Sequence, residues 1–276
     1  MEGVRAAISQ GPGRVIFLIL IAFLFVMSMY QLYKWLGGGS DQKDYILYNS
    51  PDGGLPGKNT THKVYTSPNV PGIYEGGEVS VSTWVYVTDW GTNQGKNKVI
   101  LTLSGGSTTA SYNTLVIYLG TNTNKLGVRV SYDADSKITT GATSKMTDLQ
   151  NGTGIYSDTS SNTNNGDIDN IALQKWVNIT VVLAGRTLDV YIDGKLSRST
   201  VLSQMYKVDS DKPTVKIGGP DGFGGIIGKT RIANFAYAPD QVYKNYYSGP
   251  FDNSLLGMLW AYINPGQYSV EIKKTE

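Results

Sequence analysis

The chain has 276 residues and a formal net charge of +2 at neutral pH, with 33 glycines, 19 tyrosines and no cysteine. The absence of cysteine excludes disulfides, thiolate metal sites and cysteine nucleophiles. The nearly balanced charge, with no run of Lys or Arg, argues against a nucleic-acid partner. Abundant glycine and turn-forming residues favour an all-β protein. Secreted domains of this size often carry a disulfide, so the composition leans toward a reducing compartment.

A long apolar segment follows a tail of residues 1–14. Its first part, residues 15–29, contains one polar side chain and no charge. Extended to residue 36, it reaches the roughly 20 helical residues that cross a bilayer, with aromatic residues near the end that faces the domain, as at a membrane interface. The sequence therefore predicts a transmembrane helix over residues 15–36. The anchor residues are Val15, Phe17, Leu20, Phe23, Phe25, Met29, Tyr30, Tyr33 and Trp35.

Two other interpretations of this segment are a cleaved signal peptide and a buried core helix. A signal peptide would use Arg5 and Arg14 as its charged region, but residues 29–34 lack the small side chains of a cleavage site. Lys34 lies near the end of the segment and Lys43 follows it, so the flanking charges favour a cytosolic N-terminus only by a small margin. We expect a retained, single-pass anchor.

The rest of the chain reads as a glycine-rich linker and one β domain. Residues 37–44 have the composition of a flexible linker, and residues 45–276 are expected to fold as one sandwich, including a C-terminal helix and strand over 254–263 and 268–273. Alternating apolar and polar residues predict strands. These strands cover 45–48, 63–67, 78–90, 97–104, 114–119, 126–132, 173–183, 186–192, 215–217 and 226–236.

Connections between these strands carry their own signals. Residues 141–167 form a long polar loop, and residues 239–247 favour a short helix. Asp193-Gly194 is typical of a tight hairpin turn, because both residues readily take positive φ. About ten to fourteen short strands joined in this way predict an all-β, two-sheet antiparallel jelly-roll sandwich.

Four ordered stretches resemble a known family. They are VSVSTWVYV at 79–87, WVNITVVLAGRTLDVYIDGKL at 176–196, VKIGG at 215–219 and FGGIIGKTRIANFAYAPDQVYKNY at 223–246. Together they resemble the laminin-G-like, concanavalin A-like jelly-roll family over residues 78–249. The exit of the domain, with Tyr243, Tyr246 and Ser248-Gly249-Pro250, also resembles membrane-anchored members in large icosahedral DNA viruses. The resemblance implies the fold but leaves function open, because this fold hosts lectins, glycanases, adhesion modules and structural domains.

Residues that would support catalysis are missing from the sequence. Glycan hydrolysis needs two carboxyl groups about 5 Å apart, and the family's hydrolases resemble one another in a Glu-x-Asp-x-x-Glu strand. The five glutamates, at 2, 75, 78, 271 and 276, form no such motif, and the sole histidine, His62, lies in a polar loop. We expect no catalytic residue and no enzyme activity.

Candidate ligand-binding residues are few. Gly228-Lys229 stands where many relatives have an acidic pair, so a calcium or ligand role of that region does not carry over. No cofactor or metal is predicted. Calcium is left as a possibility at three Asp-x-Asp pairs, because calcium binds carboxylate oxygens. The pair Asp133 and Asp135 is preferred to the pairs at 167/169 and 209/211. Asp also favours turns without any ligand. Five aromatic residues are candidates for stacking on sugars, although strand aromatics more often cover a sheet face. They are Trp84, Tyr86, Trp90, Tyr156 and Tyr191.

Three Asn-x-Thr sequences would accept glycans if the domain entered the secretory lumen. They begin at Asn59, Asn151 and Asn178, the last on the outward face of its predicted strand. The leading hypothesis is a non-enzymatic, membrane-anchored sandwich that makes protein–protein contacts, as a minor virion protein joining a membrane to capsid proteins. The alternative is a lectin-like, glycan-binding module at a cell surface. The expected partners are the lipid bilayer, structural proteins and possible glycans, without nucleic acid.

Overall fold

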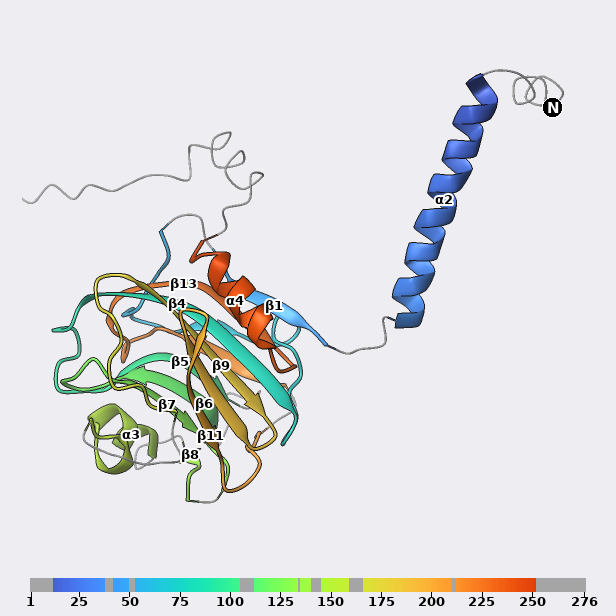
Figure 1. The fold of residues 1–276 in the computed structure, drawn as a ribbon. Coiled ribbons are helices and arrows are strands. Elements are labelled where there is room, and N and C mark those ends of the chain that lie inside the picture. Colours follow the sequence, from blue (N-terminus) through green and yellow to red (C-terminus); the bar gives the residue numbers. More distant parts are fainter. Residues whose placement is uncertain are drawn as a thin grey trace, which may run out of the picture. The chain divides into compact units, whose positions relative to one another are not determined.

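The computed structural model describes residues 12–37, 42–49, 53–104, 112–133, 135–139, 145–158, 166–209 and 212–251. The chain divides into two compact units, Met1–Gln42 and Lys43–Glu276 (Figure 1). Most of the predicted tail, residues 38–41 of the predicted linker, and the predicted C-terminal helix and strand lie outside the described residues.

The first unit contains one long helix, α2 (Pro12–Gly37). The helix begins at Pro12, within the predicted tail, because the first turn needs no amide hydrogen from that residue. Its 26 residues span about 39 Å at 1.5 Å per residue. By length and composition, the stretch Val15–Leu32 can cross a membrane.

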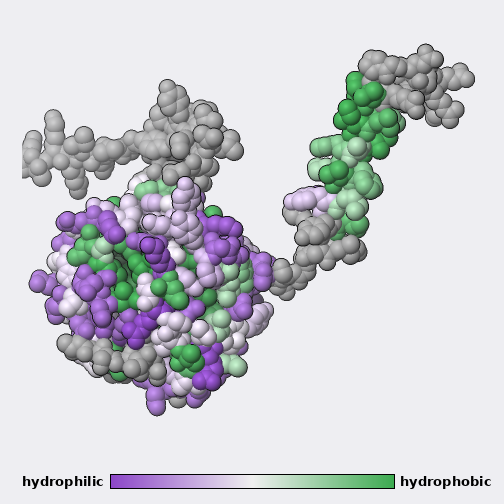
Figure 2. All heavy atoms as spheres, viewed as in Figure 1, coloured by the Kyte–Doolittle hydropathy of each residue, from purple (hydrophilic) through white to green (hydrophobic). Residues whose placement is uncertain are grey.

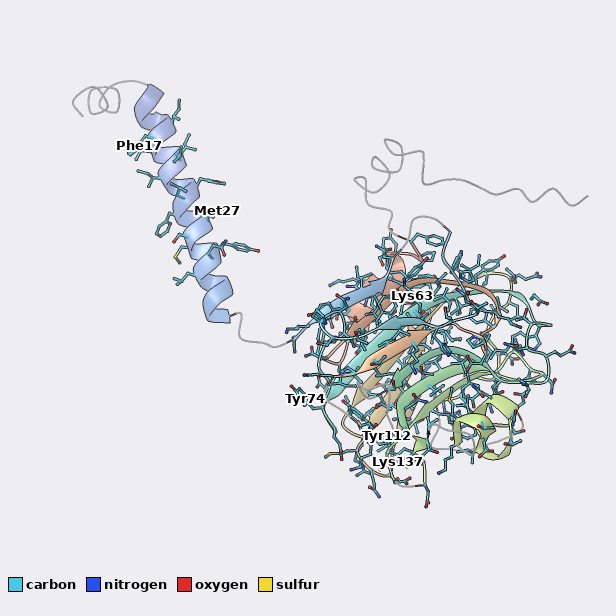
Figure 3. The ribbon with its side chains drawn as sticks, turned by 180° about the vertical axis from the view of Figure 1, so that it is seen from behind. Phe17, Met27, Lys63, Tyr74, Tyr112 and Lys137 are labelled. Carbon is cyan, nitrogen blue, oxygen red and sulfur yellow. The ribbon has the colours of Figure 1, made fainter. Side chains whose placement is uncertain are left out.

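The side chains of α2 are exposed wherever the structure describes them. From residue 15 to residue 32 none is covered by the protein. Phe17 and Met27 project outward in Figure 3, and the surface of the helix is predominantly hydrophobic in Figure 2. The predicted anchor residues 15 to 30 therefore face outward, whereas the side chains of Tyr33 and Trp35 lie outside the described set.

The second unit is a sandwich of antiparallel strands. Among the described residues, a seven-stranded sheet has the order β1-β13-β4-β9-β10-β11, with β2 paired to β13, and a six-stranded sheet has the order β3-β12-β5-β6-β7, with β8 paired to β6. The seven-stranded sheet contains β1 (Asp44–Tyr48), β2 (Leu55–Pro56), β4 (Glu78–Asp89), β9 (Trp176–Ala184), β10 (Thr187–Ile192), β11 (Lys195–Val201) and β13 (Gly224–Ala233). The six-stranded sheet contains β3 (Lys63–Tyr65), β5 (Lys98–Ser104), β6 (Tyr112–Leu119), β7 (Leu126–Val130), β8 (Ile138–Thr139) and β12 (Thr214–Ile217). The predicted class, two antiparallel sheets after one apolar helix, is confirmed.

The core lies between the two sheets and contains the residues that alternate along the strands. In β4 the valines at 79, 81, 85 and 87 are buried in it, and in β6 the residues Leu115, Ile117 and Leu119 are fully buried. Because side chains alternate between the two faces of a strand, this single pattern places one apolar row from each strand in the same layer.

The outer face of each sheet is also covered. In the predicted loop 141–167, the helix α3 (Lys145–Asn151) and the 3-10 turn η1 (Gly154–Tyr156) pack Leu149 and Tyr156 on the outer side of the six-stranded sheet. The helix α4 (Pro239–Tyr247) covers the seven-stranded sheet, with Tyr246 stacked 5.6 Å from Trp84. Polarity alone did not predict α3 or η1.

The strand β11 was also missed by the sequence analysis. Among the described strands it pairs only with β10 and forms an edge of its sheet, so most of its residues are exposed and no apolar alternation marks it. The turn that leads into it was predicted correctly. Asp193 and Gly194 have φ of +50° and +76°, as a tight hairpin with two central residues requires.

Truncating the core should destabilise the sandwich much more than truncating its surface. Ile117→Ala removes buried methyl groups between the sheets and should lower the free energy of unfolding by about 2–5 kcal/mol. Val201→Ala, at a side chain that is 64% exposed on β11, should change it by less than about 0.5 kcal/mol. Urea unfolding of the full chain in lipid nanodiscs, followed by tryptophan fluorescence, measures both. Equal midpoints for the two variants would contradict the assigned core.

Candidate functional site

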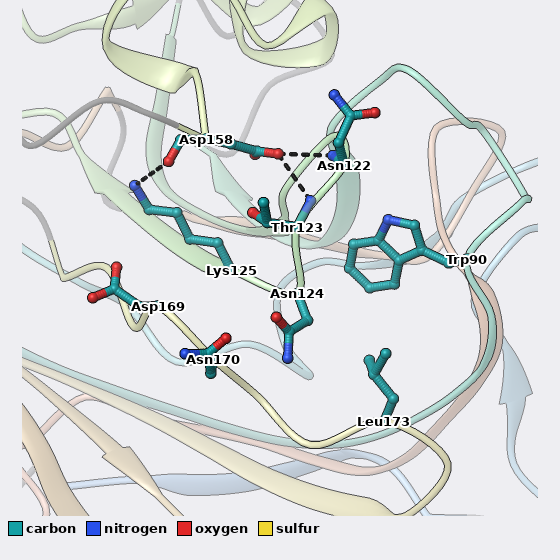
Figure 4. Close-up of a pocket in the computed structure, with 9 residues that line it drawn as sticks. All are labelled: Trp90, Asn122, Thr123, Asn124, Lys125, Asp158, Asp169, Asn170 and Leu173. Atoms are coloured by element: carbon teal, nitrogen blue, oxygen red, sulfur yellow. Dashed lines mark hydrogen bonds between the residues drawn. The ribbon is translucent and has the colours of Figure 1, made fainter.

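Four segments that are distant in sequence surround an open pocket of about 590 Å³ (Figure 4). They are the residue after β4, the turn between β6 and β7, the residues after η1, and the segment that leads into β9. The lining residues are Trp90, Asn122, Thr123, Asn124, Lys125, Asp158, Asp169, Asn170 and Leu173. A second recess of about 350 Å³ shares Trp90 and Leu173 with the first. Loops held by a rigid sandwich are common binding sites.

Asp158 fixes the turn that forms one wall of the pocket. Its carboxylate accepts the backbone N–H of Thr121 at 2.9 Å, Asn122 at 2.7 Å and Thr123 at 3.0 Å. Burial by itself raises the pKa of Asp158, but these three backbone hydrogen bonds together outweigh it and lower the pKa below its ordinary value. The ionised carboxylate is thus a structural clamp on the turn.

A buried group of charges supports the same wall. Asp167 is 6% exposed and binds the guanidinium of Arg129, and its Oδ2 lies 3.1 Å from Lys125 Nζ. Arg129 Nη2 also donates to the carbonyl of Ile155 at 2.8 Å, which attaches η1 to the sheet. Because buried charges are costly unless paired, Lys125 is committed to this group. Asp167, which the sequence analysis considered as a calcium ligand with Asp169, is engaged by basic side chains.

Trp90 forms the opposite wall and is held from behind by a buried lysine. The Nζ of Lys98 lies 4.5 Å from the centroid of the Trp90 ring and donates to the carbonyls of Lys96 at 3.3 Å, Gly120 at 3.3 Å and Thr121 at 3.1 Å. Lys98 is fully buried, and this burial lowers its pKa although Asp158 and Asp89 oppose the shift. The indole N–H of Trp90 has no acceptor among the described residues, so packing and a cation–π contact hold the ring.

Free polar groups lie between these walls. Asn122, Asp169 and Asn170 are exposed, and no described residue makes a hydrogen bond or ion pair with their side chains. Asn124 is tied by its Nδ2 to the carbonyl of Ile171 at 2.8 Å, which leaves its Oδ1 available. Figure 4 shows Trp90 and Asp169 on opposite sides of the recess, with Asn124 between them. The pocket thus combines one aromatic wall with unpartnered amide and carboxylate groups.

The other residues singled out as ligand-binding candidates lie elsewhere. Asp133 caps a turn, with its Oδ1 accepting the N–H of Ser136 at 2.6 Å, and Asp135 is exposed. Neither lines the pocket with Trp90. Within the described parts of the chain, no three His, Cys, Asp or Glu side chains are grouped as metal ligands. The expectation of no cofactor, with calcium left as a possibility at Asp133 and Asp135, stays a prediction.

The other four aromatic candidates for stacking on sugars are packed within the fold. Trp84, Tyr156 and Tyr191 are buried, and Tyr86 packs 5.5 Å from Trp176. His62 is partly buried and donates from Nδ1 to the carbonyl of Gly218 at 2.5 Å. It lines a separate recess of about 270 Å³ that includes Asp221.

The three candidate glycosylation sites differ in exposure. Asn59 and Asn151 are exposed, as expected for acceptors. The expectation that Asn178 faces solvent is wrong, because it is fully buried and its Nδ2 donates to Ser82 Oγ at 3.3 Å. Its register partner, Trp84, lies under Tyr246 of α4, a cover that the strand pattern alone does not reveal.

Comparisons with known proteins identify no family. No family model matches the chain, and no curated protein matches it. Among solved structures, the ligand-binding domain of botulinum neurotoxin serotype D in complex with N-acetylneuraminic acid is 14% identical, with 76% of this chain and 47% of that chain covered and a TM-score of 0.43. The serotype G binding domain is 15% identical, with coverage of 72% and 47% and a TM-score of 0.40. This chain spans less than half of each of those two chains. At these identities and TM-scores the likeness carries no functional argument.

Acid should release the turn that Asp158 clamps. The folded-state pKa of Asp158 lies below its unfolded value of about 4, so its stabilising effect is present above that value and is lost as the pH falls through the lower folded-state pKa. Hydrogen exchange of the full chain in nanodiscs should show the amides of residues 121–123 losing protection below about pH 4, and Asp158→Asn should expose them at neutral pH.

A matched control for this experiment is Asp240→Asn. The pKa of Asp240 is also lowered, chiefly by its hydrogen bond from Lys244, but the residue lies on α4 and contributes nothing to the pocket. The control variant should exchange at residues 121–123 like the unmodified protein. Full protection of these amides in Asp158→Asn would show that the carboxylate does not hold the turn.

Proposed function

We propose that this protein is a membrane-anchored recognition module whose sandwich binds a polyhydroxylated ligand, such as the sugar end of a glycan, beside Trp90. The observation that carries the proposal is a fixed indole ring beside Asn122, Asp169 and Asn170, whose side chains have no partner among the described residues, around one open recess. A sugar ring has an apolar C–H face and a rim of hydroxyl groups. An aromatic wall suits the face, and amide and carboxylate groups suit the hydroxyls.

We propose that the pocket binds its ligand without hydrolysing it. Only two carboxylates line the pocket among the described residues, Asp158 and Asp169. A general acid for glycosyl transfer needs a raised pKa, whereas three backbone hydrogen bonds lower the pKa of Asp158. Asp158 therefore stabilises the turn at residues 121–123 and does not act as a general acid.

The membrane anchor is the second part of the proposal. The apolar side chains of α2 are exposed from residue 15 to residue 32, and an exposed helix of this composition favours a bilayer. The sequence-based hypothesis of a minor capsid protein also requires a shell partner, and no described feature identifies one. We therefore retain the anchor and assign recognition to the pocket.

The full chain should behave as an integral membrane protein. After expression in cells it should stay in the membrane pellet through alkaline carbonate extraction and be released by detergent. Replacing Ile21 and Leu24 by arginine should release it, because each arginine costs about 2.5–3.5 kcal/mol at the centre of a span. Val201→Arg on β11 is the matched control and should remain in the pellet. Release of the unmodified chain by carbonate would contradict anchoring by α2.

Sugar binding should depend on the indole ring. A glycan array probed with the full chain in nanodiscs should show bound glycans, and Trp90→Ala should weaken their binding by about tenfold or more, roughly 1.4 kcal/mol. Trp90→Phe should retain part of the affinity. Tyr247→Ala removes an aromatic side chain that is 81% exposed on α4 and should have no effect. Thermal unfolding of each variant confirms folding, and an array without any bound glycan would overturn the proposal.

A further inference from the structure

The charges around the pocket are almost all compensated within the protein. Lys125 is bound to Asp167 and donates to the carbonyl of Asp158 at 3.4 Å. The carboxylate of Asp158 accepts three backbone N–H groups. Lys98 is fully buried behind Trp90, with its ammonium directed at three carbonyls. None of these groups offers a free charge to a ligand.

Asp169 is the exception. It lines the recess, is exposed, and has no ion-pair or hydrogen-bond partner among the described residues. The side chains that line the pocket include one lysine and two aspartates, so the lining carries a net negative charge. Residues 159–165, which connect Asp158 to Gly166, read TSSNTNN and contribute no charged side chain. That connection therefore contains no positive charge that could neutralise Asp169.

We infer that the pocket selects uncharged sugars and amino sugars over acidic sugars, and that Asp169 sets this selectivity. The inference rests on the proposed function and specifies its ligand class. A ligand carboxylate near Asp169 brings two like charges together in an open, hydrated recess. Coulomb repulsion at about 4 Å in water then weakens binding by a factor of about five. The ammonium of an amino sugar is attracted by Asp169, so its binding is strengthened by a similar factor.

Lys98 does not reverse this preference. Its ammonium lies on the back of the Trp90 ring and has no exposed surface, so it cannot contact an anion in the recess. Lys125, the other cation of the wall, is buried and engaged by Asp167, the carboxylate that it shares with Arg129. An acidic sugar would therefore find no unpaired cation to bind among the described lining residues.

Matched sugars test the inference. Each neutral sugar bound by the full chain in nanodiscs is compared with its uronic acid, in which a carboxylate replaces the CH2OH group, and with its 2-amino derivative. The uronic acid should bind about fivefold more weakly and the amino sugar equally well or up to about fivefold more tightly. Asp169→Asn should remove both differences, and Asp169→Lys should reverse them. At about 1 M salt the differences should shrink, because the Debye length falls to about 3 Å.

Asp135→Asn is the matched control, because Asp135 is an exposed carboxylate that does not line the pocket. It should leave the selectivity unchanged. If the uronic acids bind as tightly as the neutral sugars, and Trp90→Ala abolishes both, the inference fails while the proposed function stands. If discrimination persists in Asp169→Asn, the assignment to Asp169 is overturned. If no sugar binding depends on Trp90, the proposed function itself fails.

Discussion

The buried carboxylate of Asp167 joins several segments that support the pocket. It binds Arg129 of β7 and Lys125 of the preceding turn, and through Arg129 it reaches the carbonyl of Ile155 in η1. The backbone carbonyl of Asp167 also accepts Arg198 of β11 at 3.3 Å. Removing one member of such a group leaves an unpaired buried charge, at a cost of about 3–5 kcal/mol. The wall that contains Lys125 is thus fixed before any ligand arrives.

The sandwich was predictable because its strands follow a simple rule. Val79, Val81 and Val85 alternate with residues on the other face, and such alternation identifies a strand that buries one face. The helix over residues 239–247 was equally clear, with Pro239 at its start. Strand β11 lacked this signal, since an edge strand can expose both faces.

The pocket could not be predicted in the same way. Asn122, Asn124 and Asp158 occur in polar stretches that are typical of turns, and nothing local shows which turns meet in space. Trp90 was a candidate, but so were Trp84 and Tyr191, and only the covering elements distinguish them. Asn178 is likewise buried on a face of the sheet that a remote element, the helix α4, covers. Residues on the outer face of a sheet stay exposed only where no remote segment packs over them. A single sequence shows no local pattern for such contacts between remote segments.

Among the described strands, β11 lies at an edge of its sheet. This position matters where many copies of the protein are packed closely together. Under the proposed anchoring, neighbouring copies are confined to a plane, where their effective concentration is high. Strand edges with unpaired backbone groups tend to join under such conditions. Lys195 and Arg198 lie on this strand, and two copies meeting edge to edge would bring these like charges together. The strand therefore carries its own barrier to sheet extension, which would keep densely packed domains as separate, ligand-accessible units.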